Sequence, residues 1–140
     1  MRDVILDSTI TITDKSSLGV AGLKTTEIIR KVFLLSYTEL GLKDLSVVAI
    51  EGKPLKYFKS VSSRIAKYGD ELGARGGWWL RSPLTWEDTC AMYIGFNTSY
   101  SATSVFYESG VRPAFCVDND TPITLRSDVV IGQDVYVLGN

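Results

Sequence analysis

The side chains best suited to chemistry in this sequence are aromatic and small polar groups between residues 86 and 107. The segment Phe96–Ser101 reads Phe-Asn-Thr-Ser-Tyr-Ser, with Trp86 before it and Tyr107 after it. Exposed aromatic rings beside amides and hydroxyls suit stacking on saccharides or recognition of a protein surface. An ordinary solvated hairpin has the same composition and is the alternative. The candidate ligand-binding residues are Trp86, Asn97, Thr98, Tyr100 and Tyr107.

Other chemistries find little support in the residue types. The chain has no histidine, and histidine is the commonest general base and the commonest transition-metal ligand. Two cysteines, Cys90 and Cys116, are too few for a disulfide framework or a zinc site, so free buried thiols are expected, with a bridge between them as the alternative. The turn Asp118–Asp120 offers oxygens to calcium but lacks the other positions of an EF-hand loop. We expect no catalytic residue, no metal and no cofactor.

Length and composition predict one globular domain. The chain has 140 residues, of which 45% are hydrophobic and 22% charged, with a net charge of -1. No basic run marks a nucleic-acid binder. The sequence has no apolar run of about 20 residues, so it does not predict membrane insertion. It has no charged-then-apolar leader, so it does not predict a signal peptide. We expect one domain over 1–140 with its core over 30–118. Because the first predicted strand starts almost at Met1, it is left open whether the chain is the C-terminal part of a longer protein.

The candidate residues need a scaffold, and the segment 76–83 is the best source of one. It reads Gly-Gly-Trp-Trp-Leu-Arg-Ser-Pro, in which the glycines permit a tight approach and the proline ends ladder pairing. A strand here places Trp78 on one face and Trp79 and Arg81 on the other, so both faces are expected to be covered. The predicted scaffold residues are Trp78, Trp79, Arg81, Arg112 and Phe115.

The two scaffold arginines need partners, because an unpaired guanidinium inside an apolar strand is costly. A carboxylate or several backbone carbonyls would satisfy each one. The sequence does not choose among the nearby acids, which are Glu87, Asp88, Glu108 and Asp118.

The N-terminal half predicts strands and a helix. Residues 4–13 form a half-buried strand by alternation and residues 30–36 a core strand by continuous apolar character, with an exposed loop over 15–24 between them. Ser36 and Glu39 have the spacing of a capping box ahead of Gly41, which predicts one helical turn. Apolar residues at spacings of three and four predict an amphipathic helix over 55–68, with a break near Ser60 left open.

The C-terminal half predicts mostly strands. Residues 89–96 and 103–107 flank a hairpin loop of about five residues, and 110–117 form a strand with an edge or bulge at Pro113. Further strands are expected at 123–125, 129–131 and 135–138. The predicted fold class is α+β, mainly antiparallel sheet with one or two helices.

Three segments in order resemble one family: Val-Phe-Leu-Leu-Ser at 32–36, Gly-Trp-Trp-Leu-Arg-Ser-Pro at 77–83 and Gly-Val-Arg-Pro-Ala-Phe at 110–115. Over roughly 32–117 the chain resembles a domain of unknown function that recurs in tail-associated or surface proteins of Gram-positive gut bacteria, their phages and prophages. The tryptophan strand, hairpin and Gly-Val-Arg-Pro strand are also similar to the C-type-lectin-like fold of formylglycine-generating-enzyme relatives and phage adhesins.

The resemblance implies a non-catalytic binding or structural module, located on a virion or at the cell surface. The implied partners are a host-surface glycan or protein, as for an adhesin or receptor-binding tail protein, or neighbouring virion subunits, with a homo-oligomer left open. One alternative is a purely structural domain of virion assembly. Another is an enzyme related to the formylglycine-generating oxidases, which place reactive cysteines close together.

Overall fold

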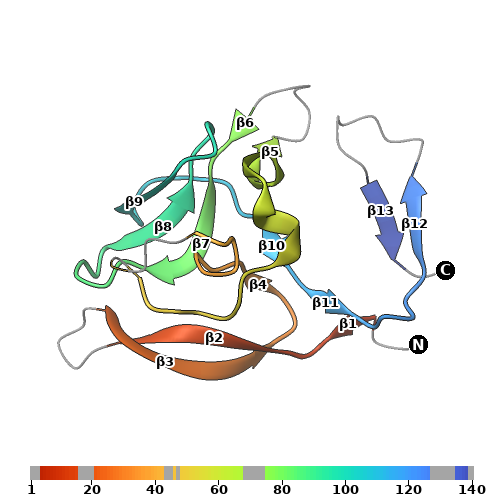
Figure 1. The fold of residues 1–140 in the computed structure, drawn as a ribbon, viewed down its shortest axis with the longest axis horizontal. Helices are drawn as coiled ribbons and strands as arrows, with labels where there is room; N and C mark the ends of the chain where they lie inside the picture. Colours follow the sequence, from red (N-terminus) through yellow and green to blue (C-terminus); the bar gives the residue numbers. More distant parts are fainter. Residues whose placement is uncertain are drawn as a thin grey trace.

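The computed structural model describes residues 4–15, 21–42, 46, 48–67, 75–126 and 135–138. These residues form mostly antiparallel β-structure with two short 3-10 helices (Figure 1). The predicted α+β class, mainly antiparallel sheet, is confirmed at that level. In chain order the elements are β1 Ile5–Leu6, β2 Ser8–Lys15, β3 Ala21–Arg30, β4 Phe33–Leu34, η1 Lys56–Lys59, η2 Val61–Arg64, β5 Ala66–Lys67, β6 Arg75–Gly76, β7 Trp78–Pro83, β8 Cys90–Ile94, β9 Tyr100–Ser104, β10 Pro113–Ala114, β11 Cys116–Val117, β12 Ile123–Arg126 and β13 Val135–Leu138.

The three-stranded sheet β7-β8-β9 carries the main core on one face. Trp78 pairs with Ile94, and both side chains are buried there because paired residues of antiparallel strands share a face. The turn 37–41 and the segment around Val48 supply further buried residues against this face. On its free edge β7 meets Gly110, whose carbonyl accepts a hydrogen bond from Trp79 N at 3.0 Å. The predicted tryptophan strand is therefore confirmed as β7, an edge strand of this sheet with a bridge to Gly110 on its outer side.

A long hairpin of β2 and β3 lies below this sheet in Figure 1 and pairs Ser8 with Arg30 at its open end. The predicted strand over 4–13 is confirmed as β1 and β2. Strand β3 was not expected, because the turn composition of 15–24 hides its start; residues 16–20 lie outside the described part of the chain. The predicted strand over 30–36 shrinks to β4, since Arg30 belongs to β3 and Val32 is exposed.

The capping box at Ser36 is confirmed. Ser36 N donates to Glu39 Oε2 at 2.9 Å, and Glu39 N donates to Ser36 Oγ at 3.1 Å. Gly41 ends the turn with φ of 67°, a conformation that glycine adopts without steric cost. The predicted single turn therefore forms where its spacing indicates.

The predicted amphipathic helix over 55–68 is wrong as a single helix, although the break near Ser60 is confirmed. Two 3-10 helices, η1 and η2, replace it and are separated at Ser60, whose ψ is 150°. Ser60 Oγ accepts a hydrogen bond from Ser63 N, and Ser63 Oγ donates to Ser60 O at 2.6 Å. Such local bonds compete with a continuous helix. Phe58 of the predicted stripe is buried, whereas Val61 is exposed, and Tyr68 lies outside the described residues.

In the C-terminal half the predicted hairpin is confirmed, with the connection 95–99 between β8 and β9. Its second strand is 100–104 rather than 103–107, so Val105, Phe106 and Tyr107 fall in a loop. The tail pairs β12 with β13 in a hairpin that stands apart from the main sheet in Figure 1. The strand predicted at 129–131 lies outside the described residues.

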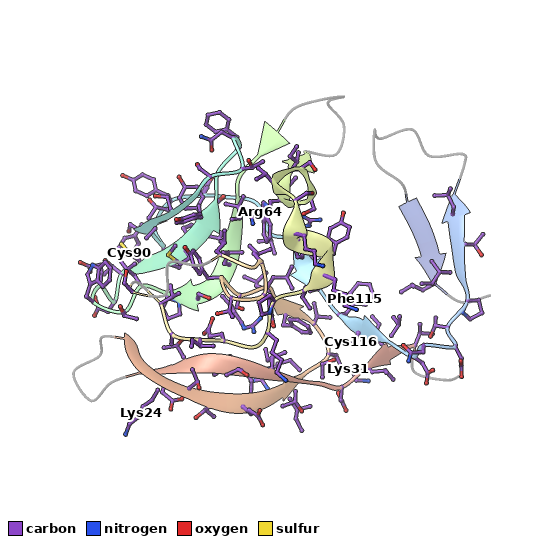
Figure 2. All side chains as sticks on the ribbon, viewed as in Figure 1. Lys24, Lys31, Arg64, Cys90, Phe115 and Cys116 are labelled. Carbon is purple, nitrogen blue, oxygen red and sulfur yellow. The ribbon has the colours of Figure 1, made fainter. Side chains whose placement is uncertain are left out.

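Phe115 was expected in the core, and that prediction is wrong. The predicted strand over 110–117 divides at Phe115 into β10, which pairs with β4, and β11, which pairs with β1. Ala114 packs against the core, and successive side chains of an extended chain face opposite sides. Phe115 (labelled in Figure 2) is accordingly 44% exposed.

Candidate ligand-binding surface

Arg81 ties β7 to the N-terminal half. Its guanidinium forms a two-pronged pair with Glu39, with Nη1–Oε2 at 2.7 Å and Nη2–Oε1 at 2.8 Å. It also donates to Thr11 O at 3.0 Å and to Leu34 O at 2.7 Å. The planar fork of arginine matches a carboxylate in this way and lysine cannot. Arg81 therefore joins three segments of the scaffold.

The acids proposed from sequence as partners of Arg81 are all wrong, because Glu39 holds that place. Among the described residues, Arg112 has neither the carboxylate nor the several backbone carbonyls that the sequence led us to expect. Its guanidinium carbon lies 5.1 Å from the Trp78 ring centroid and 5.4 Å from that of Phe58, and Nη1 donates to Ser63 O at 3.2 Å. Cation–π contacts and one carbonyl thus satisfy this second arginine.

Glu51 is a fully buried carboxyl that no sequence pattern indicated. Thr13 donates to Oε1 from both N and Oγ1 at 2.8 Å, and Ser82 Oγ donates to Oε2. Ser36 Oγ donates to the Glu51 carbonyl at 2.6 Å. We call Thr13, Ser36, Glu39, Glu51, Arg81 and Ser82 the polar core. It fixes β2, the 36–41 turn and the 48–52 segment to β7 by hydrogen bonds.

The two tryptophans of β7 differ in burial. Trp78 is 1% exposed, and its Nε1 donates to Arg64 O at 3.0 Å. Trp79 lies on the opposite face, where it is partly exposed and its ring centroid is 6.0 Å from that of Tyr93. The face of Trp79 is therefore less fully covered than the sequence predicts.

The five candidate ligand-binding residues lie at two ends of the β8–β9 hairpin. Asn97 and Thr98 are in the connection after Ile94, beside Tyr100. Trp86 and Tyr107 belong to the loops next to Cys90 and Ser104, at the opposite end. At about 3.3 Å per residue, β8 separates the two ends by roughly 13 Å. The predicted set is therefore two groups.

At the hairpin connection the candidate side chains shape the loop itself. Asn97 Oδ1 accepts hydrogen bonds from Ser99 N at 3.1 Å and from Ser99 Oγ. Thr98 has a φ of 69°, which is rare for a β-branched residue. Tyr100 packs edge-on against buried Tyr37 with ring centroids 5.2 Å apart. The neighbouring Phe96 is 69% exposed, and Tyr100 remains 44% exposed despite this contact.

At the other end four large apolar side chains face solvent. The exposed fractions are 59% for Trp86, 55% for Val105, 85% for Phe106 and 68% for Tyr107. Val105 N donates to Thr89 O at 2.9 Å, which joins the loop 84–89 to the loop 105–109. We call these four residues the aromatic loop surface. Sequence reasoning missed Val105 and Phe106 because it assigned them to a strand.

The aromatic loop surface is also acidic. Glu87, Asp88 and Glu108 are exposed in the same two loops, and the sequence has no Lys or Arg from Ser82 to Val111. Carboxylates accept hydrogen bonds from hydroxyl groups, and aromatic faces stack on apolar ones. This combination of groups suits a polyhydroxylated ligand.

Cys90 and Cys116 are free, as expected, but neither is buried, since Cys90 is partly exposed and Cys116 is exposed. They lie on different sides of the molecule in Figure 2. Within the described ranges no group of three or more His, Cys, Asp or Glu could hold a metal ion. The described residues include no helix long and apolar enough to cross a membrane.

Comparison with known proteins identifies a family. The family described as Domain of unknown function (DUF6273) matches residues 1–119 of the chain. This range contains the polar core and the aromatic loop surface and ends before β12. No curated protein and no solved structure matches the chain.

Proposed function

The chain belongs to the DUF6273 family, a domain of unknown function, and from that premise we propose that it is a non-catalytic recognition module. It binds a glycan through the aromatic loop surface. The observation that carries the proposal is the joint exposure of Trp86, Phe106 and Tyr107 in two hydrogen-bonded loops. Large exposed apolar side chains gathered in adjoining loops are typical of interaction sites.

The chemistry of the surface selects among glycans. Aromatic rings stack on the apolar faces of sugar rings, while Glu87, Asp88 and Glu108 accept hydrogen bonds from sugar hydroxyls. Three carboxylates in a sequence stretch, 82–111, that has no Lys or Arg would repel acidic saccharides. We therefore expect neutral or amino sugars to bind and sialylated or phosphorylated ones to be rejected.

The wider setting is also part of the proposal. Three ordered motifs resemble domains in phage, prophage and bacterial surface proteins, where a C-type-lectin-like fold would present its loops to a host glycan or protein. The absence of histidine from the chain supports a role without catalysis. The separation of Cys90 from Cys116 does not support an oxidase that needs paired thiols.

The test is a glycan array probed with the labelled wild-type protein and with Trp86→Ala/Tyr107→Ala. Wild type is expected to bind neutral or amino-sugar glycans, and the double variant is expected to lose at least about tenfold in affinity, because truncated hot-spot aromatics cost 2 kcal/mol or more (about 30-fold). Phe96→Ala is the matched control, since it removes an exposed ring at the other hairpin end. Equal binding by wild type and double variant would contradict the proposal.

A second candidate function is subunit assembly, and one observation favours it. The hairpin of β12 and β13 lies beyond the family match, and both Ile123 and Leu125 are exposed on it. If the hairpin mediates assembly, wild type will sediment as an oligomer and Ile123→Lys/Leu125→Lys as a monomer. A wild-type monomer at high concentration would remove this candidate without affecting glycan binding.

A further inference from the structure

A cavity lies away from the aromatic loop surface. A cavity of about 610 Å³ opens between the turn 37–41, the segment 50–55 and η1. Its volume falls in the range of about 300–1,000 Å³ that is usual for small-molecule sites. Figure 2 shows Arg64, one of its lining residues, near the centre of the molecule and Cys90, next to the aromatic loops, at the far edge.

The wall of this cavity is apolar. Phe58 and Leu42 are buried side chains at its lining, while Ile50 and Leu55 are exposed and reach solvent. Pro54 completes the apolar part. Such a wall excludes water from a bound apolar group, and burial of that group would be favourable.

The charges around the cavity are all of one sign. Lys56, Lys59 and Arg64 line it, and no lining residue is acidic. Within the described residues neither lysine forms an ion pair. Arg64 Nη2 donates to Leu40 O at 3.3 Å, but its Nε is enclosed without an acceptor from the described chain. The cavity therefore has an excess of positive charge with nothing in the described structure to balance it.

Among the described residues, two carboxyl groups beside the lining segments do not provide that balance. Glu39 lies beside lining residue Gly52 but is already paired with Arg81. Glu51 is fully buried and directs its oxygens to Thr13 and Ser82. Because both are engaged inside the fold, an anion entering the cavity would meet cations first.

We propose that this cavity binds a free small molecule with an apolar body and one anionic group, such as a carboxylate or sulfonate. The apolar body packs between Phe58 and Leu42, and the anionic group lies at the lysines of η1. This inference is independent of glycan recognition, since the two surfaces share no residue and have opposite charge.

The experiment titrates the full chain with two fluorescent probes of the same aromatic framework. 1-Anilinonaphthalene-8-sulfonate carries an anionic group, and N-phenyl-1-naphthylamine is neutral. We expect one equivalent of the anionic probe to bind, and Lys56→Glu/Lys59→Glu to weaken it by at least about tenfold, because each reversal replaces attraction by repulsion. The affinity for the neutral probe should change by less than about threefold in the same variant.

Lys53→Glu is the matched control. Lys53 is exposed, lies three residues before Lys56 and does not line the cavity. Its reversal should therefore change the affinity for the anionic probe by less than about threefold, after correction for the change in net charge. Near-ultraviolet circular dichroism verifies that each variant keeps its tryptophan packing. The proposal is overturned if both probes bind wild type equally, or if Lys53→Glu weakens the anionic probe as much as the double variant.

Discussion

The polar core and the aromatic loop surface use their side chains in opposite ways. In the polar core, Arg81, Glu39 and Glu51 contact groups from distant parts of the chain, and Glu51 is fully buried. At the aromatic loop surface, Trp86, Phe106 and Tyr107 are exposed, and backbone hydrogen bonds such as that from Val105 N to Thr89 O join the loops. Different residues therefore hold the scaffold together and form the surface that we propose for recognition.

Trp78→Ala should produce the largest loss of stability on the scaffold side. Removing this buried ring should lower the free energy of unfolding by about 3–5 kcal/mol, measured by urea denaturation. Trp79→Ala is the matched variant and should cost less than about 2 kcal/mol, because Trp79 is partly exposed. Equal losses for the two variants would show that the Trp79 face is as fully packed as the core.

Arg81→Met tests whether the ion pair is part of the scaffold. Glu39 would lose its cation while staying largely enclosed, which should cost about 3–5 kcal/mol in chemical denaturation. Arg81→Lys keeps the positive charge but not the planar guanidinium, so its stability should lie between that of Arg81→Met and that of wild type. An Arg81→Met protein as stable as wild type would remove Arg81 from the scaffold.

Glu51→Ala should produce the next largest loss of stability. Thr13 N, Thr13 Oγ1 and Ser82 Oγ would lose their acceptor, and leaving buried donors unsatisfied should cost about 3 kcal/mol. Glu51→Gln retains one acceptor oxygen and should lose less. Thermal unfolding of both variants measures the difference, and a result in which Gln and Ala are equally destabilising would contradict this account of the hydrogen bonds.

Thr98→Gly should have a smaller effect, and of opposite sign. A β-branched residue at φ of 69° is strained, so glycine should stabilise the domain by up to about 1 kcal/mol. Thr98→Ala, which keeps a Cβ, should gain less. A destabilised glycine variant would mean that the threonine side chain contributes more to the loop than its strain costs.

Local patterns predicted local structure well. The spacing of Ser36 and Glu39 predicted the capped turn, and alternation around Met92 predicted strand β8. The 55–68 stripe failed because serine side chains offered the backbone other hydrogen bonds. Helical periodicity alone does not include that competition.

Long-range pairing was the part that the sequence could not provide. Arg81 and Glu39 are 42 residues apart, and nothing in their local neighbourhoods distinguishes Glu39 from acids closer in sequence. Val105 and Phe106 were missed for a related reason, because a three-residue error in the second hairpin strand placed them in a strand instead of a loop. Register depends on the turn and on the partner strand together.

The most direct test of the central claim measures stability and glycan binding on one variant, Trp86→Ala/Phe106→Ala/Tyr107→Ala. Because all three side chains are exposed, each substitution should change the free energy of unfolding by no more than about 0.5 kcal/mol, while binding to the array glycans is lost. A variant that unfolds as readily as Trp78→Ala, or that binds as wild type does, would contradict the separation of scaffold from recognition surface.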